Sequence, residues 1–228
     1  MFTEAQVNEA IAEMKAPNVT SWELFSQVPN FKVYRRSVPN SSLKEYKVLG
    51  SYPDLPTRYL LRAYIDLDFR KSWDPNMIGW KALPNHRLHF TAKFPWPLNP
   101  REYVYELRTQ DFAEGVVCVN GKSVFDEAAP ERSGTVRVDD FRQDVVIQPT
   151  EDGRGCNIWF GYYDNPKGNI PSSIINWAAK SGIPSFLNSM RDAGLRLMKT
   201  DEENGVLDEK IQPITSTATP LPVNCLEE

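Results

Sequence analysis

The sequence has few of the residues that catalytic sites, metal sites and disulfide frameworks need. It holds two histidines, His86 and His89, and three cysteines, Cys118, Cys156 and Cys225. Three widely spaced cysteines argue against a disulfide framework and against a zinc site, so we expect free thiols. No G-x-S-x-G motif and no glycine-rich loop that opens a helix occurs. We expect surface turn histidines, no catalytic residue, no metal and no cofactor.

The sequence also lacks a basic excess and a long hydrophobic run. Its formal net charge is -4, which gives no electrostatic basis for binding nucleic acid. No run approaches the ~20 apolar residues that a membrane-spanning helix needs. Glu4, Glu9 and Glu13 occupy a segment that would be basic and then apolar in a signal peptide. We therefore expect a cytoplasmic protein that binds no nucleic acid.

The composition is that of an ordinary globular protein, with 41% hydrophobic and 25% charged residues. A chain of 228 residues suits one domain that is large enough to enclose a ligand. We place this domain at residues 1–200. The remainder, residues 201–228, is acidic and then rich in proline and threonine. Because it cannot bury enough surface to offset its ordering entropy, we predict a disordered tail.

Hydrophobic periodicity and turn residues predict an α+β fold with an antiparallel sheet. Thr3 and Gln6 form a possible capping box for the first helix. Gly182 and Pro184 should kink the last helix, because a proline inside a helix removes a backbone hydrogen bond. The predicted helices cover residues 3–15, 56–73 and 170–199. The predicted strands cover residues 22–26, 31–36, 43–50, 87–93, 102–110, 115–122, 134–148 and 155–164.

Four segments, taken in this order, resemble the START domain family and, within it, the phosphatidylcholine transfer branch. They are DLDFRKSWD at 66–74, KFPWPLNPREYVY at 93–105, ERSGTVRV at 131–138, and FGYYDNPKGNIPSSIINWAAKSGIPSFL at 160–187. The resemblance implies a helix-grip fold, in which a curved antiparallel sheet surrounds a long C-terminal helix. It also implies an internal lipid tunnel between the two.

The resemblance further implies a binding site for a lipid phosphate, formed by Tyr64, Arg70 and Gln143. A planar guanidinium can bind two phosphate oxygens, but it is costly to bury without a partner. Asp74 lies four residues after Arg70, on the same face of the expected helix, and we expect it to orient that arginine. The alternative is an ordinary Arg–Asp pair on the surface.

Phe90, Tyr103 and Phe141 correspond to a Trp-Tyr-Tyr cage for choline in the phosphatidylcholine-binding relatives. Phenylalanine attracts a cation less than tryptophan does, and we expect a Phe-rich pocket to offer no acceptor to the ammonium of ethanolamine. Phosphatidylcholine should therefore remain the preferred lipid, by a reduced margin. The alternative for these three rings is simple core packing.

Two elements are expected to control entry. Residues 126–131 resemble the family's omega loop, and the C-terminal helix resembles its lid. Trp177 and its apolar neighbours would then dip into the membrane interface, with Lys180 and Arg191 near the headgroups. Trp177 suits the role of a buried core anchor equally well.

We therefore predict a non-enzymatic protein that carries one phospholipid, which we expect to be phosphatidylcholine, between membranes that it contacts transiently. A lipid-gated interaction or sensor protein without bulk transfer is the alternative, and its protein partner is not predicted. An enzyme on the same fold is a third class, against which the missing catalytic residues argue.

Overall fold

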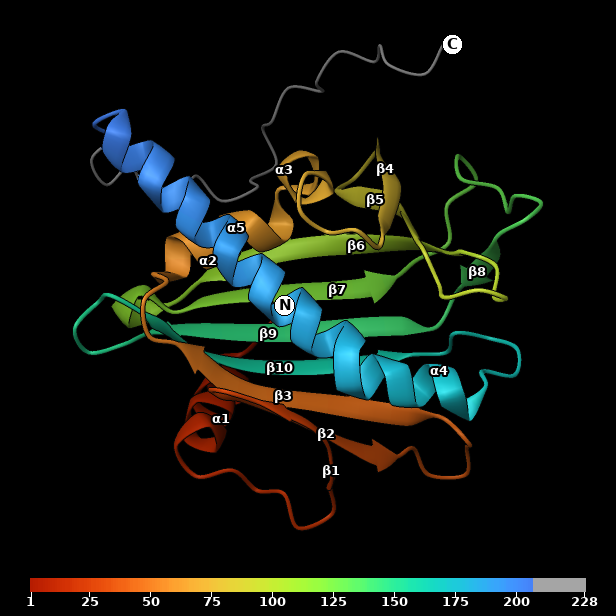
Figure 1. Ribbon diagram of the computed structural model, residues 1–228, viewed down its shortest axis with the longest axis horizontal. Coiled ribbons are helices and arrows are strands. Elements are labelled where there is room, and N and C mark those ends of the chain that lie inside the picture. The colour runs from red at the N-terminus through yellow and green to blue at the C-terminus, as the bar shows by residue number, and fades with distance from the viewer. Residues whose placement is uncertain (207–228) are drawn as a thin grey trace.

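The computed structural model describes residues 1–206 (Figure 1). Residues 207–228, and with them Cys225 and most of the predicted tail, lie outside the described residues. The helices are α1 (Glu4–Lys15), α2 (Thr57–Ile65), α3 (Leu67–Lys71), η1 (Ala113–Gly115), α4 (Ser172–Trp177), η2 (Ala178–Gly182) and α5 (Ile183–Glu203). The strands are β1 (Glu23–Val28), β2 (Phe31–Ser37), β3 (Lys44–Tyr52), β4 (Met77–Leu83), β5 (Arg87–Ala92), β6 (Arg101–Asp111), β7 (Val117–Ser123), β8 (Val136–Val138), β9 (Phe141–Pro149) and β10 (Cys156–Asp164).

The strands form one sheet in the order β1-β2-β3-β10-β9-β7-β6-β5-β4. All neighbours along this path are antiparallel, which confirms the predicted antiparallel sheet, while β8 pairs with β6 in parallel. The long helix α5 crosses one face of the sheet (Figure 1). The predicted α+β class, with a curved sheet gripping a C-terminal helix, is confirmed. No helix within residues 1–206 is long and apolar enough to cross a membrane.

The two faces of the sheet have different coverings. Helix α1 begins with the predicted capping box at Thr3 and packs Val7 and Ala10 against the outer face, where Cys118 and Val146 are buried. On the inner face, residues of β3, β6, β9 and β10 pack with α2 and α5. Strand alternation sorts the side chains between these faces, since successive residues point in opposite directions. The inner face therefore holds the main hydrophobic core. Cys118 and Cys156 are buried free thiols, as predicted.

Three predicted elements differ from the structure. The helix expected over 56–73 is divided at Asp66, whose carboxylate caps α3 by accepting from the backbone N–H of Phe69 at 2.9 Å. The strand expected over 134–148 is divided between Val138 and Phe141, so that β8 and β9 pair with different neighbours. Strand β4 was not predicted, although it pairs with β5 across a turn in which Asn85 has a φ of 61°. Only a few residue types adopt that conformation readily, and asparagine is one of them.

The C-terminal helix is irregular close to where a kink was predicted. Residues 178–182 form a π-helical turn, and Pro184 follows directly in the first turn of α5. A proline cannot donate a backbone hydrogen bond, and a π-helical turn is one way to accommodate that loss. The helix ends at Glu203, beyond the predicted domain end at residue 200. There Asp201 pairs with Arg62 of α2 at 3.2 Å.

A buried charge cluster fixes the predicted omega segment to the outer face of β6. The side chain of Glu102 is fully buried and contacts His89 at 3.0 Å, Arg132 at 3.0 Å and Arg137 at 2.9 Å. Arg137 also donates to the carbonyl of Ala129, within the omega segment, at 2.8 Å. The prediction that both histidines lie in a surface turn is thus wrong for His89, which belongs to β5. Burial raises the pKa of Glu102, but hydrogen bonds from His89 and the arginines outweigh it, so the pKa falls below its ordinary value.

Replacement of this carboxylate should strongly destabilise the protein. Glu102→Gln leaves the buried guanidinium of Arg137 without a counter-charge, a change that typically costs about 3–5 kcal/mol. Urea unfolding should show this loss in the free energy of unfolding. The exposed pair of Glu106 with Arg108 provides a control, and Glu106→Gln should change stability by less than about 1 kcal/mol. Equal stabilities of the two variants would contradict the role given to the cluster.

Candidate functional site

An ion pair lies below α5, at the end of the short helix α3. The Nε and Nη2 atoms of Arg70 each lie 2.9 Å from Oδ2 of Asp74. The side chains are 16% and 3% exposed, so the alternative of an ordinary surface pair is wrong. Oδ1 of Asp74 accepts from the backbone N–H of Asn76 at 3.0 Å, which holds the carboxylate in place. The predicted orientation of Arg70 by Asp74 is thus present.

The guanidinium of Arg70 lies among four aromatic rings. Its Cζ atom lies 5.4 Å from the ring centroids of Tyr64 and Phe90, 5.8 Å from that of Trp73 and 5.3 Å from that of Phe186. Among the described residues, its Nη1 atom has no hydrogen-bond partner. A cation held by rings and one carboxylate keeps donors for an incoming anion. Since Phe186 belongs to α5, the C-terminal helix closes this site.

Tyr64 and Gln143 meet beside this arginine. The Tyr64 hydroxyl donates to Oε1 of Gln143 at 2.8 Å, which joins α2 to β9. Gly121 of β7 makes room, because a Cβ atom there would lie 2.8 Å from Cγ of Gln143. Burial raises the pKa of Tyr64 to about 12. The phenol therefore stays protonated at neutral pH and remains a hydrogen-bond donor.

The predicted cage residues form a connected group of rings on the inner face. The ring centroids of Phe90 and Tyr103 are 6.5 Å apart, and those of Tyr103 and Phe141 are 5.4 Å apart. Tyr162 of β10 extends the group, 5.8 Å from Phe141. Phe90 contacts both Arg70 and Tyr103 and thereby links the ion pair to the rings. The structure thus brings all seven predicted binding residues together in one contiguous site.

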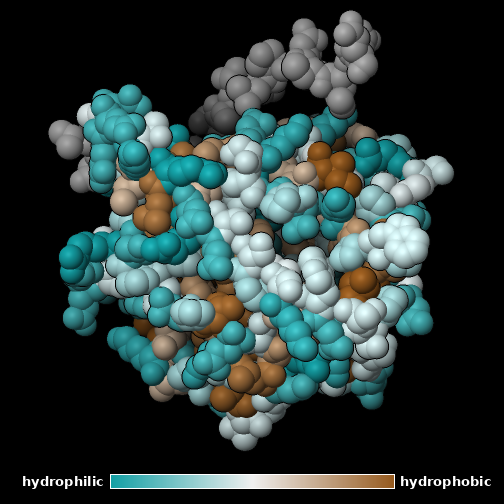
Figure 2. Space-filling model, in the orientation of Figure 1, coloured by the Kyte–Doolittle hydropathy of each residue, from teal (hydrophilic) through white to brown (hydrophobic). Residues whose placement is uncertain are grey.

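Several inner side chains keep accessible surface although they lie deep in the protein. Tyr64 and Tyr162 are only partly buried, yet removal from water is the main cause of the rise in the pKa of each. Phe90 and Phe160 are also partly buried. The lipid tunnel that the family resemblance implies would lie among these side chains and stays a prediction. Figure 2 shows hydrophobic residues recessed within this face of the molecule.

Asp164 belongs to the site and was missed as a candidate residue. Its Oδ2 atom accepts from the hydroxyls of Tyr103 at 3.0 Å and Tyr162 at 3.1 Å. The expectation that the ring pocket offers no hydrogen-bond acceptor is therefore wrong. Strand alternation could have identified this residue, since Phe160, Tyr162 and Asp164 share one face of β10. A carboxylate on the inner face of a hydrophobic strand was the available signal.

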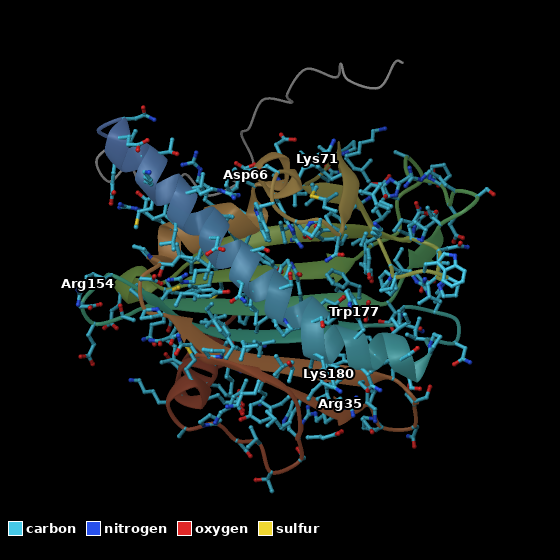
Figure 3. All side chains as sticks on the ribbon, in the orientation of Figure 1. Arg35, Asp66, Lys71, Arg154, Trp177 and Lys180 are labelled. Carbon is cyan, nitrogen blue, oxygen red and sulfur yellow. The ribbon has the colours of Figure 1, made fainter. Side chains whose placement is uncertain are left out.

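The predicted lid is partly exposed and is held against β1. Trp177 is 44% exposed, so its interpretation as a buried core anchor is wrong (Figure 3). Ser26 of β1 donates to the carbonyl of Ala179 in the π-helical turn at 2.5 Å. Lys180 is exposed and borders a groove of about 530 Å³ between β1 and this turn. Arg191, which we expected near the headgroups, pairs with Asp54.

A second exposed tryptophan lies at the same end of the molecule as the start of the lid. Trp96, in the loop between β5 and β6, is 89% exposed. The buried guanidinium of Arg101 connects this loop to the one before α4, because it donates to the carbonyls of Asn99 at 2.6 Å and Pro166 at 3.0 Å. Both loops lie at the right of Figure 1. One arginine thus fixes Trp96 relative to the lid.

Comparisons with known proteins agree with this geometry. The phosphatidylcholine transfer protein of Bos taurus is 34% identical over 207 residues, which cover 87% of this chain and 97% of that protein. The human phosphatidylcholine transfer protein is 33% identical and covers 87% of this chain and 96% of its own length. Among solved structures, human STARD10 superposes with a TM-score of 0.72 at 20% identity, over 90% of this chain and 85% of that one. The START domain model matches residues 3–200, and the chain belongs to the START domain family.

Proposed function

We propose that this protein is a cytoplasmic lipid carrier that binds one glycerophospholipid, phosphatidylcholine, between its sheet and α5 and moves it between membranes. The buried pair of Arg70 and Asp74, next to a group of aromatic rings, is the observation that carries this proposal. The names of relatives such as the bovine phosphatidylcholine transfer protein support the choice of ligand. The family membership supports carriage without chemical change.

The proposed headgroup site has two parts that suit a zwitterion. Arg70 would bind the phosphate through Nη1. The Tyr64 hydroxyl, which has one proton, would turn from Oε1 of Gln143 to the phosphate, and the Gln143 side chain would lie beside it. The rings of Phe90, Tyr103 and Phe141 would surround the choline group, which is attracted to their faces. Phe90 lies between the two parts, so one headgroup can reach both. The acyl chains would lie between the sheet and α5, among the apolar side chains of the inner face.

Membrane contact is proposed for the end of the molecule that carries Trp96 and the lid. Tryptophan favours the membrane–water interface, and Lys180 is exposed on the π-helical turn that follows Trp177 (Figure 3). Opening would break the hydrogen bond from Ser26 to Ala179, which is an exchangeable contact near the surface. The groove between β1 and the π-helical turn would then widen into an entrance for the lipid. Residues 126–131 remain a proposed part of this entrance.

Removal of the phosphate site should abolish most transfer without unfolding the protein. Arg70→Leu alone would leave Asp74 buried and unpaired, which costs about 3 kcal/mol or more, so the double variant Arg70→Leu/Asp74→Asn is the better test. We expect phosphatidylcholine transfer between vesicles to fall roughly 30-fold, the equivalent of about 2 kcal/mol. The matched control is Arg154→Leu/Asp152→Asn, which removes an exposed ion pair in the loop between β9 and β10, away from the proposed site and entrance.

Full transfer by the folded Arg70→Leu/Asp74→Asn variant would contradict the site. The same assay separates transfer from the sensor alternative, because a lipid-gated sensor would bind phosphatidylcholine but exchange it slowly in the wild type too. A circular-dichroism melting curve of each variant checks that it is folded. Rapid exchange by the wild type and by the control pair supports a carrier.

Membrane contact should depend on Trp96. Trp96→Ala removes an apolar side chain that is already exposed, so stability should not change. Binding to phosphatidylcholine vesicles should weaken roughly tenfold, because about 1.4 kcal/mol of interfacial burial is lost. Trp96→Phe keeps an aromatic ring and should bind with an intermediate affinity. Unchanged vesicle binding by Trp96→Ala, measured by flotation, would show that this loop stays out of the membrane.

A further inference from the structure

The carboxylate of Asp164 is a charged group that the proposed phosphate and ring sites leave unexplained. It points to the inner face of β10, next to Tyr103, and keeps part of its surface accessible. Both tyrosine hydroxyls that bind it, those of Tyr103 and Tyr162, donate to Oδ2. Oδ1 has no donor among the described residues, so it keeps its lone pairs for another group. The hydroxyls of Tyr103 and Tyr162, which hold Oδ2, place this free oxygen beside the ring group.

The charge of this carboxylate is not neutralised by a direct partner. Within residues 1–206, no ion pair includes Asp164. Arg101 is the nearby cation, but its guanidinium donates to the backbone carbonyls of Asn99, Pro166 and Lys167. Burial raises the pKa of Asp164 above its ordinary value, although both tyrosines and Arg101 oppose that rise. A carboxylate in such a place is stabilised by any cation that a ligand brings.

The charges of the site indicate which part of the lipid headgroup would bring a cation to Asp164. The positive charge of Arg70 is already balanced by Asp74. A bound phosphate therefore meets a neutral pair, and Asp164 adds a negative charge on the far side of Phe90 and Tyr103. A headgroup with an amine at its end matches this pattern. A headgroup that carries only the phosphate charge places no cation there and leaves Asp164 uncompensated.

We propose that Asp164 is the headgroup-selecting residue, which favours phospholipids with a cationic amine over anionic phospholipids that lack one. This inference rests on the proposed phospholipid-carrier function and states which headgroup charges the site favours. Choline, which has no N–H group, interacts with Asp164 only through its charge. The primary ammonium of ethanolamine also donates hydrogen bonds, and Oδ1 of Asp164 can accept one. Loss of the carboxylate should therefore affect ethanolamine lipids more than choline lipids.

Competition between three lipids tests this rule. The full chain is incubated with vesicles that contain equal amounts of phosphatidylcholine, phosphatidylethanolamine and phosphatidylglycerol, and the bound lipid is extracted and quantified by mass spectrometry. We expect the wild type to bind at least tenfold more phosphatidylcholine than phosphatidylglycerol. Asp164→Asn, which keeps the shape of the side chain, should reduce that ratio at least fivefold. It should also lower the ratio of bound phosphatidylethanolamine to phosphatidylcholine.

Asp140→Asn is the matched control, because Asp140 is exposed and also accepts from a tyrosine, Tyr163, at 2.7 Å. Its lipid ratios should equal those of the wild type. Ratios within one sample do not depend on how much of a variant is folded. Wild-type ratios in Asp164→Asn would overturn the inference, and so would equal binding of phosphatidylcholine and phosphatidylglycerol by the wild type. A wild type that binds none of the three lipids would instead contradict the proposed function.

Discussion

The buried ion pair between Arg70 and Asp74 is the interaction on which the proposed site depends. A guanidinium inside a hydrophobic core is stable only if its charge is balanced. Asp74 supplies the counter-charge, and four rings from α2, β5, α5 and the segment after α3 enclose the cation. The pair is therefore maintained without a ligand, while Nη1 stays free for an anion. The helix grip is what makes this arrangement possible, because α5 contributes Phe186 from above.

A second constraint is that each buried polar side chain on the inner face needs a hydrogen-bond or ion-pair partner. Tyr64 with Gln143, and Asp164 with two tyrosines, meet this requirement in different ways. In the first pair the Tyr64 proton is donated to Gln143, and the side-chain amide N–H groups of Gln143 remain as donors for a phosphate. The second keeps a negative charge at the other end of the ring group. The site is thus polarised along its length, which is the pattern that a zwitterionic headgroup needs.

Much of this organisation was predictable from the sequence, and the failures concern contacts between segments that are far apart in it. The capping box at Thr3 and the irregularity next to Pro184 follow from hydrogen-bonding rules that act within one turn. The order of the strands, and the position of His89 against Glu102, depend on contacts between distant segments. Six of the seven predicted binding residues were found through family resemblance, and Asp74 through its helical spacing from Arg70. Periodicity alone does not separate a ring cage from a packed core. Strand alternation places Asp164 on the inner face, but its two hydroxyl donors, from β6 and β10, are brought together only by the fold.

Native mass spectrometry of the protein purified from cells tests the central claim most directly. The account predicts a complex of one chain with one glycerophospholipid, and fragmentation should release a phosphocholine headgroup. The unliganded protein, incubated with phosphatidylcholine vesicles, should regain the same single mass increment. A sterol in place of the phospholipid, or a chain that neither retains nor regains a phospholipid, would contradict the account.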